Sequence, residues 1–248
     1  MKILGIIPAR YTSTRFPGKP LVEINGKSMI RRVYEQARQC PALSWIVVAT
    51  DDSRIFDHVS SFGGEVVMTH QNHKSGTERC SEAAQIWKSS GREFEAIINI
   101  QGDEPFIHPE QINQLAVLMH QEETNIGTLV KRINSYDELI DSNVVKVVLD
   151  NRFRALYFSR SAIPYIRHQE PKDWHSNAVF YKHIGIYGFR SQILYEIAAL
   201  NPSPLETVES LEQLRWMEHG YAIISRITEL DSISIDTPSD LLKLTNKV

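Results

Sequence analysis

Residues 6–21 read IIPARYTSTRFPGKPL, and this stretch decides how the rest of the chain is interpreted. The apolar run at residues 3–7 ends at a proline and has no amphipathic period, which is typical of a strand buried in a parallel sheet. The loop that follows carries Arg10, Arg15 and Lys19 and ends in turn-forming residues. Ligands of open α/β sheets bind beyond the carboxyl ends of the strands, so this loop is predicted to hold an anion.

The chemistry of this loop favours a polyphosphate. Guanidinium groups bind phosphate oxygens in pairs, and an ammonium adds a point charge. The loop is not a Walker A motif, because Gly26-Lys27-Ser28 is preceded by Leu21 where the first glycine should stand, and no G-x-G-x-x-G follows the strand. A solvated basic loop is the plainer interpretation. Three cations within ten residues, directly after a buried strand, favour a site.

The length and composition of the chain are typical of one large globular domain. The 248 residues are 42% hydrophobic, which is enough for a sizeable core. The formal net charge of −3 excludes a globally basic surface, so no nucleic-acid partner is expected. No apolar stretch approaches the length of a membrane span, so no membrane partner is expected either.

Cysteine usage and the start of the chain bear on the compartment. Cys40 and Cys80 are isolated, have no metal or redox spacing, and are expected to be reduced thiols. Met1 and Lys2 lead directly into the first predicted strand and leave no room for a signal peptide. The chain is therefore expected to be cytoplasmic.

Strands and helices alternate through the first half of the chain. Residues 28–40 have the spacing of an amphipathic helix that covers a sheet. Further strands are predicted at residues 45–50, 65–68 and 96–100. Further helices are predicted at residues 53–62, 77–89 and 109–120. Four such alternations predict an α/β fold with a doubly wound, mainly parallel sheet.

The second half is richer in β-structure. Strands are predicted at residues 126–133, 143–150, 153–158, 183–189, 221–227 and 232–235, with a hairpin turn at Asp150-Asn151. Residues 161–182 are predicted to be irregular. One helix is predicted from the N-cap Ser203 to Glu218, and a last one after Thr237. This half looks grafted onto the first sheet, so residues 1–248 are expected to form one domain, with 1–125 as the nucleotide-binding half and 126–248 as the second half.

Two carboxylates are placed where a metal ion could bind. Asp103 lies in the loop after the strand at 96–100, and Asp236 follows the strand predicted at 232–235. Either one alone is equally well explained as a turn or N-cap aspartate. Carboxylates together with substrate phosphates are what Mg²⁺ prefers. With the cationic loop, they suggest metal-assisted nucleotidyl transfer.

A third group of polar residues precedes the helix predicted at 77–89. Ser75 and Gly76 lie at its N-terminus, where free N–H groups can receive ligand oxygens. Arg79 is one turn into the helix and can bind an anion. His70 and His73 are spaced like a weak metal pair, but no carboxylate cluster joins them, so a zinc site is rejected.

At this point a resemblance to a known family is clear. The chain resembles the 3-deoxy-manno-octulosonate (Kdo) cytidylyltransferases. The matching segments follow one order over nearly the whole chain: IIPARYTSTRFPGKPL, VATDD, HKSGTER, NIQGDEP, VVKVVLD, ALYFSRSAIP, HIGIYGFR, SPLETVESLEQLR and IDTPSDL. The resemblance implies a nucleotidyltransferase fold of the glycosyltransferase-A type with a β-rich embellishment for sugar binding and dimerisation. It also implies CTP and Kdo as substrates, Mg²⁺ as cofactor, a homodimer, and a product used in lipopolysaccharide core synthesis.

The resemblance further implies roles for individual residues. The nucleotide-binding set would be Pro8, Ala9, Arg10, Arg15, Lys19, Ser75, Gly76 and Arg79. The metal would be held by Asp103 and Asp236, and these two with Arg10 and Lys19 form the expected catalytic set. The acidic sugar would be surrounded by Gln101, Arg160, His183, Tyr187, Glu209 and Gln213. Glu209 and Gln213 are expected on one face of the helix, and Glu212 is an alternative to Glu209. Residues 166–181 match nothing in the family's pattern.

Two alternatives stay open at this point. The acceptor could be another acidic sugar, such as 8-amino-Kdo or a sialic acid, and the region of Arg160, His183 and Tyr187 would decide this. The chain could also be a nucleotide-binding regulator that kept the fold without the chemistry. That requires loss of a metal carboxylate, and Asp103 and Asp236 are both present.

Overall fold

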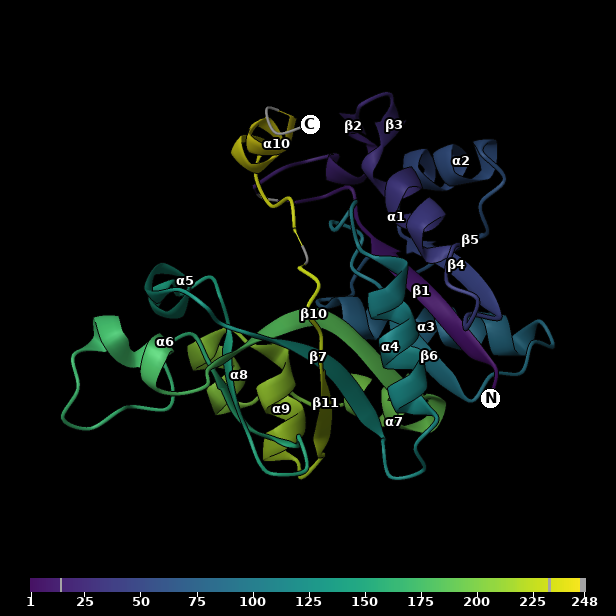
Figure 1. The fold of residues 1–248 in the computed structure, drawn as a ribbon. Coiled ribbons are helices and arrows are strands. Elements are labelled where there is room, and N and C mark those ends of the chain that lie inside the picture. The colour runs from purple at the N-terminus through teal and green to yellow at the C-terminus, as the bar shows by residue number, and fades with distance from the viewer. Residues whose placement is uncertain (14, 232, 246–248) are drawn as a thin grey trace.

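The computed structural model describes residues 1–13, 15–231 and 233–245 and is built on one central mixed sheet (Figure 1). Its strand order is β11-β7-β10-β6-β1-β4-β5. The parallel part consists of β1 (Ile3–Ala9), β4 (Trp45–Thr50), β5 (Val66–Met68) and β6 (Ala96–Asn99). The predicted mainly parallel sheet is confirmed.

The second half of the chain extends this same sheet. β10 (Tyr181–Arg190) runs antiparallel between β6 and β7 (Ile126–Arg132), and β11 (Ile223–Ile227) lies parallel to β7 at the edge. β8 (Lys146–Leu149) and β9 (Ala155–Ser159) form the predicted hairpin around Asp150-Asn151, and β8 also pairs with the start of β10. The sheet is therefore mixed because one long strand reverses direction.

Helices cover both faces of the sheet. One face packs against α1 (Met29–Ala37), α2 (Ser53–Ser61) and α4 (Pro109–Met119). The other packs against α3 (Gly76–Ser89), α7 (Ser191–Ala198) and α9 (Glu212–Glu218). In β1, Ile3 and Ile7 enter the first core, whereas Leu4 and Ile6 enter the second. Burial on both faces explains why this strand reads as a continuous apolar run.

A small lobe stands apart at the left of Figure 1. It contains α5 (Tyr136–Ile140), the 3-10 turn η2 (Pro171–Asp173) and α6 (Trp174–Asn177). Its own apolar cluster includes Leu139, Trp174 and Phe180. The irregular stretch predicted at residues 161–182 therefore holds two short helical elements and the first residues of β10.

Two sequence predictions in the second half are wrong. The helix predicted from Ser203 to Glu218 is two helices, α8 (Pro204–Glu209) and α9, because Ser210 between them has a left-handed backbone with φ of 53°. The break lets α9 bury Leu214 and Trp216 while α8 stays at the surface. The strand predicted at 232–235 is also wrong: residues 233–235 form no ladder, and residue 232 lies outside the described residues.

The remaining elements are short or terminal. η1 (Lys19–Leu21) follows the cationic loop, and β2 (Glu23–Ile24) pairs with β3 (Lys27–Ser28). The predicted last helix is α10 (Pro238–Thr245). Among the described residues, no helix is long and apolar enough to cross a membrane.

Candidate active site

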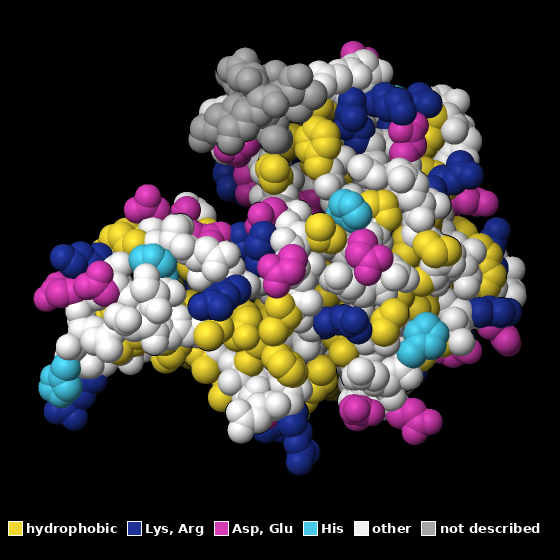
Figure 2. Space-filling view, viewed as in Figure 1, with side chains coloured by type: hydrophobic (Ala, Val, Ile, Leu, Met, Phe, Trp, Pro, Cys, Tyr) yellow, Lys and Arg dark blue, Asp and Glu magenta, His cyan; other side chains and the backbone are white. Residues whose placement is uncertain are grey.

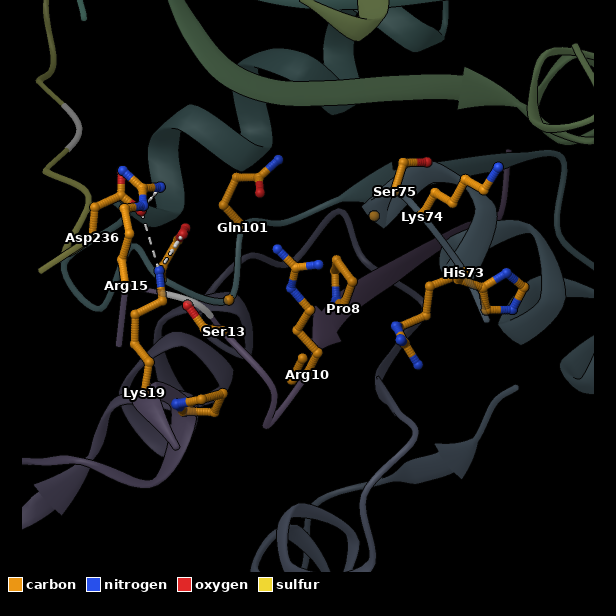
Figure 3. A pocket seen from close by; sticks show the side chains of 16 residues that line it. Pro8, Arg10, Ser13, Arg15, Lys19, His73, Lys74, Ser75, Gln101 and Asp236 are labelled. Atoms are coloured by element: carbon orange, nitrogen blue, oxygen red, sulfur yellow. Dashed lines mark hydrogen bonds and ion pairs between the residues drawn. The ribbon is translucent and has the colours of Figure 1, made fainter. Parts of the chain in front are cut away.

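A cleft of about 300 Å³ opens at the carboxyl ends of β1 and β6 (Figure 3). Its walls come from the loops after these strands, the N-terminus of α3 and the segment before α10. It is lined by all eight residues expected to bind nucleotide, Pro8, Ala9, Arg10, Arg15, Lys19, Ser75, Gly76 and Arg79. It also contains Gln101, Asp103 and Asp236. The fold thus gathers segments far apart in sequence where open α/β sheets bind ligands.

The cationic loop is held in shape by an aromatic ring. Gly18 has φ of +71°, and a Cβ at this position would come within 3.1 Å of the Tyr11 ring. The Gly18 N–H donates to the Tyr11 carbonyl oxygen at 2.9 Å. On the Tyr11 ring, the Arg54 guanidinium carbon lies 3.3 Å from the centroid, and Asp52 binds Arg54 through both carboxylate oxygens. This packing fixes the turn from which Lys19 enters the cleft.

The two candidate metal carboxylates meet at Lys19. The Lys19 ammonium lies 2.8 Å from an Asp103 oxygen and 3.3 Å from an Asp236 oxygen (Figure 3). Arg15 contacts the same Asp236 oxygen at 3.0 Å. The Ile235 N–H donates to the Asp103 carbonyl oxygen at 2.9 Å, so the main chain also joins the two segments. The predicted carboxylate pair is therefore brought together, although Asp236 follows no strand.

The two carboxylates fit a magnesium ion that is bound jointly by the protein and by a substrate. Mg²⁺ in phosphoryl-transfer sites is held by one or two carboxylates, with substrate phosphates and waters as the other ligands. Asp103 and Asp236 supply two carboxylates beside a cationic wall. Within the described residues, no three His, Cys, Asp or Glu side chains form a group that could hold a metal. An ion that is also bound by substrate phosphates needs fewer ligands from the protein than an ion held by protein alone.

The N-terminus of α3 forms the opposite wall. The Ser75 hydroxyl accepts a hydrogen bond from the Glu78 N–H and caps the helix. Arg79 is almost fully buried and donates to Thr69 Oγ1 at 2.6 Å and to Asp51 Oδ2 at 2.9 Å. Arg79 therefore ties α3 to the ends of β4 and β5, in addition to lining the cleft.

On the sugar side, only Gln101 of the six expected residues lines this cleft. Its amide donates to the Gly185 carbonyl oxygen at 2.9 Å, which orients the side chain between β6 and β10. Of the other five, Arg160 follows β9 and Glu209 ends α8. His183 and Tyr187 lie on β10, and Gln213 lies on α9. Gln213 is buried, and it does not share a helical face with Glu209, because the helix breaks at Ser210.

Hydrogen bonds of Arg160 and Glu209 join the end of β9 to the end of α8. The guanidinium donates to the carbonyl oxygens of Glu209 at 2.8 Å, Ser142 at 3.0 Å and Ser210 at 3.3 Å. The Glu209 carboxylate accepts hydrogen bonds from the Ser159 hydroxyl and the Arg160 N–H. Three of the five guanidinium N–H donors are thus used on main chain, which leaves two for a carboxylate ligand.

His183, which is half-buried, and Tyr187, which is buried, form a polar pair on β10. His183 Nε2 lies 3.0 Å from Thr128 Oγ1, and its ring centroid lies 5.0 Å from that of Tyr187. Burial lowers the pKa of His183 to about 3, so the imidazole is neutral at physiological pH. Burial, with the nearby Glu212 carboxylate, raises the pKa of Tyr187. The buried Tyr187 hydroxyl finds no hydrogen-bond partner among the described residues and is therefore a candidate ligand contact.

Glu212 differs sharply from Glu209 in its surroundings. Its carboxylate accepts hydrogen bonds from the Thr77 hydroxyl at 2.8 Å and from Arg215 at 2.9 Å. Burial raises the pKa of Glu212 despite these contacts. Glu212 therefore joins α9 to the start of α3, whereas Glu209 joins α8 to β9.

Comparison with known proteins shows the family of this chain. The sequence model of the cytidylyltransferase family matches residues 4–227. A 3-deoxy-manno-octulosonate cytidylyltransferase of Parabacteroides distasonis is 54% identical over 98% of this chain and 96% of its own length. The corresponding protein of Cytophaga hutchinsonii is 51% identical over 99% and 97%.

A solved structure shares the fold over the whole chain. It is CMP:2-keto-3-deoxy-manno-octonic acid synthetase in complex with CTP, with a TM-score of 0.90 and 40% identity. The alignment covers 100% of this chain and 98% of the other. This chain belongs to the 3-deoxy-manno-octulosonate cytidylyltransferases. Family membership confirms the fold that the motifs predict, while the roles of individual residues stay predictions.

Sequence reasoning missed contacts that this cytidylyltransferase makes between distant segments. The Tyr11–Arg54 stacking is one of them. Another is the ion-pair network in which Asp231 binds Lys131 of β7 and Lys182 of β10, while Lys182 also binds Glu138 of the small lobe. None of these residues stands in a recognisable spacing. The one signal for this network is that Lys131 of β7 and Lys182 of β10 stand opposite each other in the sheet.

Proposed function

We propose that this chain transfers CMP from CTP to the anomeric hydroxyl of Kdo in a Mg²⁺-dependent reaction that releases pyrophosphate. One observation carries the proposal: Lys19 bridges Asp103 and Asp236 in a cleft lined by the cationic loop and the N-terminus of α3. Such a site can neutralise a triphosphate on one side and hold a metal on the other. The identity of about half the residues with the named relatives supports CTP and Kdo as substrates.

The residues of the cleft would work by position and charge. Arg10, Arg15 and Lys19 would bind the triphosphate, and Ser75 and Gly76 would receive nucleotide oxygens at the N-terminus of α3. Asp103 and Asp236 would hold Mg²⁺, which when bound supplies positive charge beside the reacting phosphate. The reaction forms a bond between the sugar oxygen and the α-phosphorus and breaks the bond to pyrophosphate. Since no covalent enzyme intermediate is required, holding the two substrates in line provides much of the rate.

The sugar would lie between this cleft and β10. Gln101 reaches the cleft and is fixed to β10 through Gly185. Arg160 retains two donors for the sugar carboxylate, and neutral His183 with the unpartnered Tyr187 hydroxyl suits sugar hydroxyls. Glu209 and Gln213 would complete this side. In Figure 2 the surface is hollowed beside the lobe of α5 and α6, which offers a path for a sugar.

The same proposal includes an oligomeric state, a compartment and a use for the product. The chain would act as a homodimer in the cytoplasm, where CTP is available, and its product would supply lipopolysaccharide core synthesis. Exposed apolar side chains in the second half, including Phe153, Leu156 and Val208, support a dimer surface there.

The test is pyrophosphate release over a panel of nucleotides and sugars. CTP, ATP, GTP and UTP are each paired with Kdo, 8-amino-Kdo and a sialic acid at saturating Mg²⁺. The expected result is efficient release with CTP and Kdo, and poor release with sialic acid, because a site built of hydrogen-bonding groups penalises a mismatched ligand. Equal efficiency with sialic acid would overturn the sugar assignment. No release from any pair would overturn the enzymatic function.

A further inference from the structure

The two site carboxylates are held side by side by the main chain. The Ile235 N–H donates to the Asp103 carbonyl oxygen at 2.9 Å, immediately before Asp236. The Ile235 side chain is fully buried against Ile24 and Met29. The main chain therefore holds Asp236 beside Asp103 without help from the side-chain ion pairs. The pair requires a positive charge because two facing carboxylates repel each other.

In the structure, that positive charge is the Lys19 ammonium. It contacts both carboxylates, at 2.8 and 3.3 Å, and its side chain is only 14% exposed. Arg15 reaches only Asp236 and is 65% exposed, so water screens its charge much more. Among the described residues, Lys19 is the cation that contacts both members of the pair.

The same ammonium is needed elsewhere when substrates bind. In the proposed function, Lys19 binds the triphosphate of CTP, and Asp103 and Asp236 bind the metal ion. An ammonium has three N–H donors, and Lys19 directs two of them at the carboxylate oxygens that a metal would use. Lys19 must therefore leave these oxygens before a divalent cation can share them.

We propose that Lys19 is the resident counter-ion of the carboxylate pair and is displaced to the nucleotide phosphates when a divalent cation arrives. This inference rests on the proposed function and adds an exchange of partners to it. Without nucleotide, a displaced Lys19 has no new partner, so metal binding is weak. With nucleotide, the phosphates receive Lys19, so metal and nucleotide each strengthen the binding of the other by the same factor.

The experiment measures Mn²⁺ binding to the full chain without nucleotide, by the electron paramagnetic resonance signal of free Mn²⁺. The variant is Lys19→Met, and the matched control is Lys74→Met. Lys74 lines the same cleft, and its side chain contacts neither carboxylate, so the control removes one positive charge without freeing the site. Lys19→Met is expected to bind Mn²⁺ about tenfold more tightly than wild type, since a charge-assisted hydrogen bond no longer competes. Lys74→Met should stay within about threefold of wild type.

A second measurement uses thermal unfolding of the same proteins. Without metal, Lys19→Met should unfold at a lower temperature than wild type, because the carboxylates lose their counter-ion. Added Mn²⁺ should raise its midpoint more than that of wild type. Mn²⁺ affinity of Lys19→Met no higher than that of Lys74→Met, or undetectable, would overturn the inference. That result would leave the proposed activity standing, because wild-type pyrophosphate release is assayed separately.

Discussion

Single residues in this protein often carry two contacts that serve different parts of the site. Glu212 binds Thr77 at the N-terminus of α3 and Arg215 on its own helix. Gln101 lines the cleft and is oriented by the Gly185 carbonyl. His183 lies within hydrogen-bond distance of Thr128 and packs against the rings of Phe158 and Tyr187. The folded protein therefore favours the neutral imidazole. Substitution at such positions should alter stability and function together.

His183 gives a prediction on pH. Its pKa falls from 6.5 to about 3 on burial, so between these values the unfolded state binds the extra proton. Stability from this group is complete above pH 6.5 and is lost as pH falls toward 3. Between pH 7 and 5, wild type should lose about 2 kcal/mol of unfolding free energy more than His183→Gln. Urea unfolding at both pH values measures this, and equal losses in the two proteins would contradict it.

At the scale of elements, local patterns predicted more than distant contacts. β1 and its cationic loop follow directly from an apolar run and turn residues, and the sequence placed both correctly. The Ser210 break was not predicted, since burial of Leu214 and Trp216 outweighs a good helical pattern. The strand expected before Asp236 failed because Ile235 packs into a small cluster instead of a ladder.

The same limit applies to the candidate site. The motifs named most of the residues that line the cleft, but nothing in their spacing showed that Lys19 would bridge Asp103 and Asp236. Arg79 looked like a free anion-binding group one turn into a helix. Its partners, Asp51 and Thr69, directly follow β4 and β5, so only the fold reveals that its guanidinium is already engaged.

The stacking of α2 on the cationic loop gives the second prediction. Tyr11→Leu removes the ring that supports Gly18, and Arg54→Met removes the guanidinium above it. Tyr11→Leu should raise the KM for CTP about five- to tenfold, and Arg54→Met about two- to fivefold. Tyr11→Phe keeps the ring and is the control that should stay near wild type. Steady-state kinetics with each substrate varied measure this, and an equal rise in the KM for Kdo would point to general damage instead.

Among the described residues, large apolar side chains are exposed more often in the second half of the chain than in the first. Figure 2 shows hydrophobic side chains gathered on the lower part of the face, where α8 and α9 lie. Val208 of α8 is 83% exposed and Leu156 of β9 is 51% exposed. Apolar side chains gathered on one exposed face are typical of an interface.

The third prediction concerns this surface. Light scattering at micromolar concentration should give twice the mass of one chain. Leu156→Glu should shift the mass toward that of one chain, because a buried charge opposes association. Val117→Glu is the matched control, since Val117 is 46% exposed on α4 in the other half, and this variant should remain dimeric. A wild-type monomer would refute the proposed homodimer.

Cytidylyl transfer is expected to take place where Asp103 and Asp236 meet. The most direct measurement is single-turnover formation of CMP-Kdo from labelled CTP at saturating Mg²⁺ by wild type, Asp103→Asn and Asp236→Asn, with folding checked by circular dichroism. Each variant should fold normally and transfer CMP about 10²- to 10³-fold more slowly, because a charge-stabilising contact is lost. Transfer at nearly the wild-type rate by either folded variant would contradict the proposed role of these two carboxylates.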